Sequence, residues 1–267
     1  MRIGVIGVGT IGAALVEGLL RAGAAEPQDI AGTTGHPESA MEAKRRLGID
    51  VHTDNRALAR DRDVVILAVK PATMPKVLAE VKDLLSPSQV VITLAAATPI
   101  RSVEEALGRP IPVIRAMPNT PCQIGQGMTA LCPGRHAGPH HLALARAVFS
   151  PLGRVATVDD EGLMDAVTAL SGSGPAYAYI IIEALAEGGV KMGLPRKLAT
   201  ELAAQALLGG AALVLQSGQH PAVPKADVTT PAGVTIDGLM ALEEGGLRVA
   251  LIKAVVAATE RAKTLAR

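Results

Sequence analysis

The feature that most constrains the fold of this chain is the glycine pattern Gly7-Val8-Gly9-Thr10-Ile11-Gly12. It follows residues 2–6, which are typical of a β-strand, and it opens residues 11–21, which are typical of a helix. In a strand–turn–helix unit this spacing indicates dinucleotide binding. The first glycine permits a tight turn, the second lets a pyrophosphate approach the backbone, and the third lets helix and strand pack closely. The N–H groups at the helix start then face negative charge.

Strand and helix patterns alternate after this motif. Residues 63–69 form a continuous apolar run after a single Asp, which suits a strand buried on both faces of a parallel sheet. We expect further strands at 28–31, 89–94 and 111–115, and helices at 37–47, 73–85 and 100–107. The alternation predicts a doubly wound α/β sheet, that is, an amino-terminal Rossmann dinucleotide-binding domain.

The pattern changes at Asp159-Asp160-Glu161, after which nearly all segments are helical. Glycines and prolines separate expected helices at 162–170, 176–191, 195–216, 235–243 and 247–265. We therefore divide the chain into a Rossmann domain, residues 1–158, and an all-α domain, residues 159–267. Segments such as Tyr179–Ile182 and Ala206–Leu208 are apolar on more than one face, so we expect a subunit interface in the helical domain.

Composition argues against several classes of protein. A net charge of +1 and an aromatic content of 1% speak against a nucleic-acid partner. The longest apolar run, 206–215, is shorter than the roughly 18–20 residues of a membrane helix. Arg2 and the apolar residues after it resemble a signal peptide, but Glu17 interrupts them, so we expect a cytoplasmic enzyme. Cysteine and histidine spacing, including the neighbours His140 and His141, predicts no metal site.

The segment Ala31–His36 bears on the choice of nucleotide, because the ribose is recognised roughly 20 residues after the glycine motif. No carboxylate for a ribose 2′-hydroxyl occurs before Glu38. Thr33 and Thr34 could donate hydrogen bonds to a 2′-phosphate, and His36 or Arg45 could add charge. The pattern favours NADP, although no Arg stands next to the strand and use of NADH stays open.

A second helix start lies at Thr230-Pro231, where Thr230 suits the N-cap and Pro231 the first helical position. The N–H groups that follow, on Ala232, Gly233 and Val234, are then expected to be unpaired and to suit a carboxylate. Thr235 adds a hydroxyl. An ordinary helix start explains the segment equally well. The similar stretch Ser171–Pro175 is interpreted as a tight turn between domains.

Six segments together resemble the pyrroline-5-carboxylate reductase family: Ile6–Gly12, Asp63–Pro71, Ile114–Gly127, Leu170–Tyr177, Ala184–Leu194 and Val228–Gly238. The resemblance runs along nearly the whole chain. It implies transfer of a hydride from NADPH to the C=N carbon of 1-pyrroline-5-carboxylate, which gives L-proline in the last step of proline biosynthesis. It also implies helical domains that pair into homodimers, which commonly assemble into a decamer.

The resemblance also implies roles for individual residues. Ile6 to Ile11 would hold the pyrophosphate, and Thr33, Thr34 and Asn55 would lie near the adenosine ribose and its phosphate. The nicotinamide would be lined by Ala68, Val69, Lys70, Pro71, Ala95, Ala96 and Ala97. The N–H groups of Gly233 and Val234, with Thr230, would bind the substrate carboxylate, and Thr235 would hydrogen-bond the ring nitrogen as the catalytic residue. The chain departs from the family at Ala232, where a glycine is usual, at Val234, and at Gly218, where some relatives are acidic.

Two alternatives remain at this stage. The β-hydroxyacid dehydrogenases also join a Rossmann domain to helices and use a helical lysine, for which Lys191 is the candidate. A dinucleotide-sensing module that has lost catalysis is the non-enzymatic alternative. The first predicts activity on hydroxy acids, and the second predicts NADPH binding without turnover.

Overall fold

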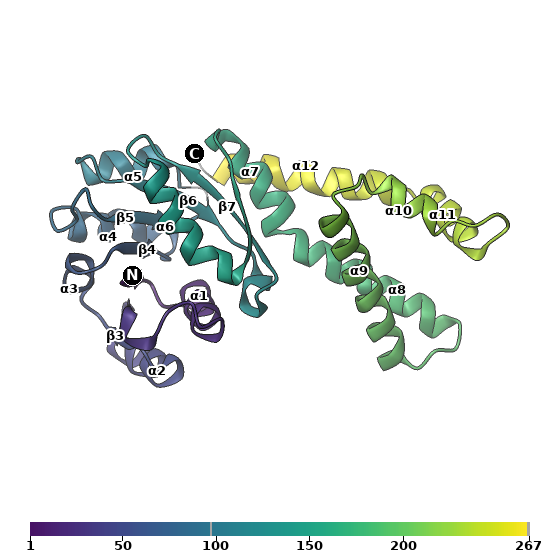
Figure 1. Cartoon of the computed structure of the whole chain (residues 1–267), viewed down its shortest axis with the longest axis horizontal. Helices are drawn as coiled ribbons and strands as arrows, with labels where there is room; N and C mark the ends of the chain where they lie inside the picture. Colours follow the sequence, from purple (N-terminus) through teal and green to yellow (C-terminus); the bar gives the residue numbers. More distant parts are fainter. Residues whose placement is uncertain (97, 266–267) are drawn as a thin grey trace. The chain divides into compact units, whose positions relative to one another are not determined.

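The computed structural model describes residues 1–96 and 98–265, which form two compact units. The first comprises the described residues up to Ser173 together with those from Ala258 on, and the second comprises Gly174–Ala257. The first unit is α/β and the second is helical (Figure 1). The sheet ends at Thr157, next to the predicted boundary at Asp159, whereas the compact helical unit begins later along the chain.

The described part of the first unit contains one eight-stranded sheet in the order β3-β2-β1-β4-β5-β6-β7-β8. All neighbouring strands are parallel except β6 and β7, which are antiparallel. The predicted doubly wound sheet is therefore confirmed, while the short β3 and the final pair β7 and β8 were not predicted. The strands are β1 (Ile3–Ile6), β2 (Ile30–Thr33), β3 (Asp50–His52), β4 (Val64–Leu67), β5 (Val90–Thr93), β6 (Val113–Met117), β7 (Gly127–Pro133) and β8 (Gly153–Thr157).

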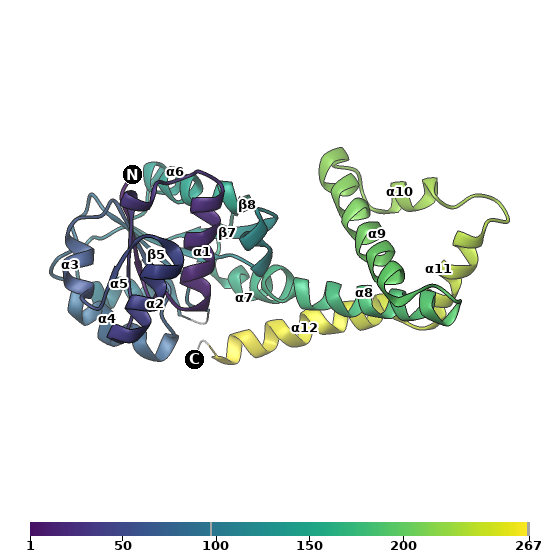
Figure 2. The same cartoon turned by 90° about the horizontal axis from the view of Figure 1, so that it is seen from below.

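Helices cover both faces of this sheet. One core cluster joins the sheet to α1 (Thr10–Arg21), α2 (Pro37–Leu47) and α6 (Pro139–Phe149). The other joins it to α3 (Asn55–Arg60), α4 (Met74–Val81) and α5 (Ile100–Leu107) (Figure 2). Along β4, Val64 and Ile66 enter the first cluster and Val65 and Leu67 the second, which explains why that run is apolar throughout. Short helices complete the unit: η1 (Pro27–Asp29), η2 (Pro71–Thr73), η3 (Thr120–Ile124), η4 (Ser150–Leu152), η5 (Glu161–Leu163), α7 (Met164–Val167) and the π-helical turn η6 (Thr168–Gly172).

A buried ionic cluster ties η5 and α7 to the sheet. Arg115 on β6 is 3% exposed, and its Nη1 lies 3.1 Å from Glu161 Oε1. Its Nη2 lies 3.9 Å from Asp165 Oδ1, and the same Glu161 oxygen accepts the N–H of Ile100 at 2.8 Å. Arg115 Nε and Nη2 have no hydrogen-bond partner among the described residues. The guanidinium charge therefore depends on the two carboxylates that follow β8.

The second unit is built from α8 (Gly174–Lys191), α9 (Arg196–Ser217), α10 (Ala222–Asp227), α11 (Val234–Glu244) and α12 (Leu247–Leu265), whose last turns belong to the first unit. Gly193 and Gly218 have positive φ values of 98° and 66°, so they end α8 and α9 as the predicted breakers. The predicted turn at Ser171–Pro175 is instead the end of η6 and the start of α8, although the boundary between the units lies there, after Ser173.

Helix α9 leaves a long apolar surface unburied. It has 22 residues, a window of mean hydropathy 1.6, and only 11% of that window is buried. By length and composition alone, α9 could cross a membrane, whereas the sequence analysis found no apolar run of that length. Leu202, Leu208, Leu213 and Leu215 are among its exposed side chains. This surface requires some covering layer.

Candidate dinucleotide and substrate sites

The turn after β1 gives each motif glycine a distinct role. Gly7 has a φ of +100°, and an added Cβ would lie 2.8 Å from Val69 Cγ1. A Cβ on Gly12 would lie 2.3 Å from the Gly7 carbonyl oxygen, so this glycine lets α1 pack against the turn. A Cβ on Gly9 would meet nothing within 4 Å. The tight turn at Gly7 and the close packing at Gly12 are as the sequence predicted, and the open space at Gly9 leaves room for a ligand to approach the backbone, which stays a prediction.

A cleft of about 680 Å³ adjoins this turn. It lies at the carboxyl ends of β1, β2 and β4, where β1 pairs with strands on both sides and the strand order reverses. Ligands of open α/β sheets bind at such a switch point. The predicted cofactor residues that line it are Gly7, Gly9, Thr10, Thr34, Ala68, Val69 and Lys70.

The remaining cofactor predictions lie around the cleft. Ile6, Gly12 and Thr33 are buried beneath the turn, while Ile11 is 56% exposed at the start of α1. Pro71 begins η2 and is exposed; Ala95 is buried and Ala96 is exposed after β5. The predicted Ala97 lies outside the described residues.

The cleft also has walls that the sequence interpretation missed. Residues of α1 and α2 at helical spacing line it, and this spacing is the signal that could have found them. Arg46, rather than the expected Arg45, lines the cleft, and its Nε lies 3.3 Å from Glu17 Oε1. The additional lining residues are Ala13, Ala14, Glu17, Gly35, Ser39, Glu42, Ala43, Arg46, Thr73 and Gln123, while Val8 belongs to the predicted pyrophosphate segment.

The two threonines after β2 already use their hydroxyl groups. Thr33 Oγ1 donates to Asn55 Oδ1 at 2.6 Å, and Thr34 Oγ1 donates to the His36 carbonyl at 3.0 Å. Thr33 is 1% exposed. Both hydroxyls donate within the chain in this structure, so their expected donation to a 2′-phosphate stays a prediction, and Thr33 brings Asn55 to the end of β2.

The predicted substrate segment folds differently from the expected helix start. Helix α11 begins at Val234 with Gly233 as its N-cap, not with Thr230. The Gly233 N–H donates to the Thr230 carbonyl at 3.0 Å, and Ala232 has a φ of +56°. These features form a type II turn, in which Pro231 suits the second position and a residue with positive φ the third. A proline followed by a left-handed residue closes the turn before the helix can start.

The turn changes which N–H groups are available to an anion. The Gly233 N–H, predicted to be free, is engaged in the turn, whereas Val234 and Thr235 occupy the first turn of α11 and have no partner within the helix. Val234 is 87% exposed and Thr235 is half-buried. The structure therefore brings together the Val234 N–H, the Thr235 N–H and the Thr235 hydroxyl at one helix start.

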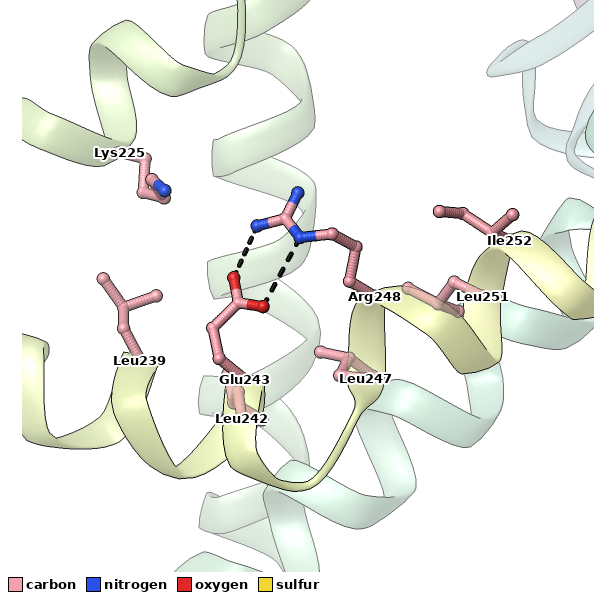
Figure 3. Close-up of a pocket in the computed structure, with 8 residues that line it drawn as sticks. All are labelled: Lys225, Leu239, Leu242, Glu243, Leu247, Arg248, Leu251 and Ile252. Carbon is pink, nitrogen blue, oxygen red and sulfur yellow. Dashed lines mark hydrogen bonds and ion pairs between the residues drawn. The ribbon is translucent and has the colours of Figure 1, made fainter.

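A separate hollow of about 430 Å³ lies among α10, α11 and α12 (Figure 3). Its floor is formed by Leu239, Leu242, Leu247, Leu251 and Ile252. Glu243 and Arg248 form two hydrogen bonds at its rim, and Arg248 lowers the pKa of Glu243. Because this ion pair is exposed, it adds little stability. The hollow extends the uncovered apolar surface of the helical unit.

The residues of the other interpretations are placed as follows. Lys191, the candidate for a dehydrogenase acid/base group, is the last residue of α8 and is exposed. His141 Nδ1 accepts the Gly138 N–H at 3.0 Å, so it caps α6. Among residues 1–96 and 98–265, no group of three or more His, Cys, Asp or Glu side chains could hold a metal ion.

Comparison with known proteins decides between these possibilities. A model of pyrroline-5-carboxylate reductase dimerisation matches residues 161–265, and one of NADP oxidoreductases, coenzyme F420-dependent, matches residues 2–97. The pyrroline-5-carboxylate reductase of Methanosarcina acetivorans is 42% identical over 266 residues, which cover 100% of this chain and 98% of that relative. The chain belongs to the pyrroline-5-carboxylate reductase family. The Arabidopsis thaliana family member is 37% identical and is matched over 96% of its length and 100% of this chain.

Solved family structures agree with this assignment. A Coxiella burnetii pyrroline-5-carboxylate reductase superposes with a TM-score of 0.92 at 36% identity, covering 100% of this chain and 98% of the other. The Plasmodium falciparum family member, solved with NADP bound, gives 0.88 at 30% identity over 100% of this chain and 98% of its own. Prephenate dehydrogenase from Aquifex aeolicus, at 17% identity and 0.56 over 93% of this chain and 98% of its own, shares the fold alone. The family resemblance and the fold class predicted from the sequence, a Rossmann domain followed by a helical dimerisation domain, are confirmed.

Proposed function

We propose that this protein is an NADPH-dependent pyrroline-5-carboxylate reductase that forms L-proline from 1-pyrroline-5-carboxylate, the last step of proline biosynthesis. The observation that carries the proposal is the cleft at the Gly7–Gly12 turn, in a chain that matches its reductase relatives from end to end. NADPH is the preferred cofactor, and NADH is the alternative donor. The Plasmodium falciparum family member with bound NADP supports this choice.

The reaction places modest demands on side chains. When bound, NADPH would supply a hydride to the imine carbon. The C=N electron pair would move to nitrogen, which would take a proton from water, so that proline and NADP⁺ would result. Holding two reactants in register supplies about 7–11 kcal/mol of barrier reduction. We assign Thr235 as the catalytic residue that hydrogen-bonds the ring nitrogen. The Val234 N–H binds the substrate carboxylate, and the turn of Thr230 and Gly233 holds that N–H in place.

We also propose the cofactor contacts. The turn after β1, from Ile6 to Gly12, holds the pyrophosphate, because it combines free helix-start N–H groups with the open space at Gly9. The end of β2, with Thr33, Thr34 and Asn55, lies at the adenosine ribose. The nicotinamide side is assigned to Ala68, Val69, Lys70, Pro71, Ala95, Ala96 and Ala97.

The decisive measurement follows absorbance at 340 nm with synthetic 1-pyrroline-5-carboxylate and either NADPH or NADH. We expect imine-dependent oxidation that is faster with NADPH. Thr235→Ala should lower turnover by about 10–1000-fold, as loss of one preorganised contact does. Thr229→Ala is the matched control, because the Thr229 hydroxyl is already bound to the Lys225 carbonyl at 2.8 Å. Binding of NADPH with no oxidation by any imine would contradict the proposal, and unchanged kinetics of Thr235→Ala would remove that residue from the mechanism.

We propose that the helical unit pairs with a second copy and that dimers assemble further into a decamer. Within residues 174–257, the buried apolar side chains are Ala186, Ala199 and Ala203, whereas large apolar side chains on α9, α11 and α12 are exposed. A surface of this kind is typical of an obligate interface. Light scattering after gel filtration should give a multiple of the 27.3 kDa chain. Leu208→Asp should dissociate it, whereas the exposed control Lys197→Asp should not.

We also propose a cellular location and a functional boundary for the chain. We place the protein in the cytoplasm, without a nucleic-acid or membrane partner, and we place the functional boundary between residues 158 and 159. The net charge of +1 supports the absence of a nucleic-acid partner, and the change from β8 to helices supports the boundary. Recovery of the native protein in a membrane fraction would contradict the cytoplasmic location. Limited proteolysis tests the boundary between residues 158 and 159.

A further inference from the structure

The side-chain amide of Asn55, on α3, links Glu80, near the end of α4, to Thr33 at the end of β2. Asn55, the first residue of α3, donates from Nδ2 to Glu80 Oε2 at 2.8 Å. Its Oδ1 accepts from the Thr33 hydroxyl at 2.6 Å. The chain of hydrogen bonds thus runs from α4 through α3 to the end of β2. Neither the glycine motif nor the family resemblance pointed to Glu80.

The carboxylate of Glu80 fixes the direction of this chain. An ionised carboxylate only accepts hydrogen bonds, so the amide nitrogen of Asn55 must face Glu80. The amide oxygen must then face Thr33, whose hydroxyl has to act as the donor. Without Glu80, the side-chain amide of Asn55 could rotate by 180°, and the Thr33 hydroxyl could donate its hydrogen bond to another acceptor.

The same threonine anchors the phosphate turn. The Thr33 carbonyl accepts the N–H groups of Gly7 and Val8, at 3.0 and 2.8 Å. Thr33 is 1% exposed, whereas Asn55 and Glu80 are half-buried. Thr33 therefore connects the side-chain network with the backbone of the turn, and Asn55 keeps a second amide hydrogen that these bonds do not use.

We propose that Glu80 is a positioning residue for the dinucleotide, which acts through Asn55 to orient the end of β2. The inference rests on the proposed function, because it assumes that a dinucleotide occupies the cleft after β1. The effect is on cofactor affinity rather than on hydride transfer. Removal of Glu80 weakens NADPH and NADH binding while kcat stays nearly constant.

The test is a double-mutant cycle on NADPH dissociation constants, measured by nicotinamide fluorescence in the intact protein. Glu80→Ala is expected to raise the dissociation constant about 3- to 10-fold, as loss of one hydrogen bond does. Glu80→Gln keeps the length of the side chain but can donate as well as accept, so it no longer fixes the direction of the Asn55 amide and should raise the dissociation constant toward the value of Glu80→Ala. Because Glu80 acts through Asn55, Glu80→Ala should add nothing to Asn55→Ala. Asp83→Ala, an exposed carboxylate just beyond α4, controls for charge.

The outcomes of these measurements decide whether Glu80 positions the dinucleotide. An unchanged dissociation constant in Glu80→Ala or in Glu80→Gln, or independent effects of Glu80 and Asn55, would overturn the inference. If Glu80→Ala does not fold, Glu80→Asp, which is too short to reach Asn55, should weaken binding about as much as Glu80→Gln. A parent protein that binds NADPH but reduces no imine overturns the proposed reaction alone. One that binds neither nucleotide overturns both.

Discussion

In the turn before α11, the hydroxyl of Thr230 occupies the space that a side chain at Gly233 would need. An added Cβ there would lie 2.4 Å from Thr230 Oγ1 and 3.1 Å from the Thr230 carbonyl oxygen, which already accepts the Gly233 N–H. The φ of Gly233 is −81°, which any residue can adopt, so the constraint at this position is steric. The proposed substrate turn is therefore sensitive to a single methyl group.

Gly233→Ala should lower kcat/KM for the imine about 10- to 100-fold, because Thr230 must move and a displacement near 1 Å has effects of about that size. NADPH affinity should not change. Gly238→Ala is a matched control on the same helix, since a Cβ there meets nothing within 4 Å. Equal kinetics for the two variants would show that the turn does not position the substrate.

Ala232→Gly should stabilise the protein. Ala232 is the one residue other than glycine with positive φ among the described residues. Left-handed backbone costs an L-residue about 1–2 kcal/mol, while glycine loses about 0.5–1 kcal/mol more than alanine in chain entropy. The free energy of unfolding in urea should thus rise by about 0.5–1 kcal/mol. Ala226→Gly, inside α10, should lower it instead, and a decrease for both variants would refute the strain argument.

Glu161→Ala should destabilise the first unit. It leaves the buried Arg115 guanidinium with Asp165 alone and removes the acceptor of the Ile100 N–H. Breaking a buried pair costs about 3–5 kcal/mol, and partial exposure of Glu161 reduces this to about 2–3 kcal/mol. Urea unfolding gives the value. Glu105→Ala, which breaks an exposed pair with Arg101, should leave the midpoint nearly unchanged. A similar small change for Glu161→Ala would mean that Arg115 is stabilised without that carboxylate.

Protonation of His141 should weaken the start of α6. Burial, followed by the charge of His140, lowers the pKa of His141, and its Nδ1 accepts the Gly138 N–H only in the neutral form. Since the folded state disfavours the proton, this contribution is present above the ordinary histidine pKa and is lost as the pH falls through the lowered value.

The control for this effect is His141→Gln, because glutamine at this position also caps the helix and does not titrate. The two proteins should unfold at similar temperatures at pH 8. Towards pH 5 the parent should become less stable by less than about 1 kcal/mol, the size of one cap on a half-buried side chain. Parallel curves across this range would exclude the cap as a titrating element.

The sequence predicted elements whose pattern is local. The glycine motif and the apolar runs of β1 and β4 follow directly from turn geometry and burial on both faces. The strands β3, β7 and β8 were missed, because β3 is three residues long and β7 pairs antiparallel in a sheet that is otherwise nearly all parallel. Their pairing depends on partners far along the chain, which periodicity does not report.

The residues of the candidate site likewise divide into those that the sequence predicted and those that it did not. The lining of the cleft by Gly7, Gly9 and Lys70 was predictable from the motif and the family, whereas Arg46 required knowledge of which face α2 turns inward. Thr230 was predicted as the N-cap and Pro231 as the first helical residue, and both predictions are wrong, because Gly233 is the N-cap and α11 begins at Val234. The start itself was placed too early, because propensity does not reveal that Ala232 adopts positive φ and closes a turn.

Because the space beside Gly9 is open, the fold and the reaction constrain different glycines of the motif. Gly7 and Gly12 are required by the packing of β1 and α1, so any descendant that keeps this architecture retains them whether or not it uses a nucleotide. Under the proposed function, only Gly9 is left to be maintained by the ligand. In a lineage that abandons the reaction, mutations should therefore accumulate first at position 9, which makes that codon a marker of whether a related chain still works as a reductase.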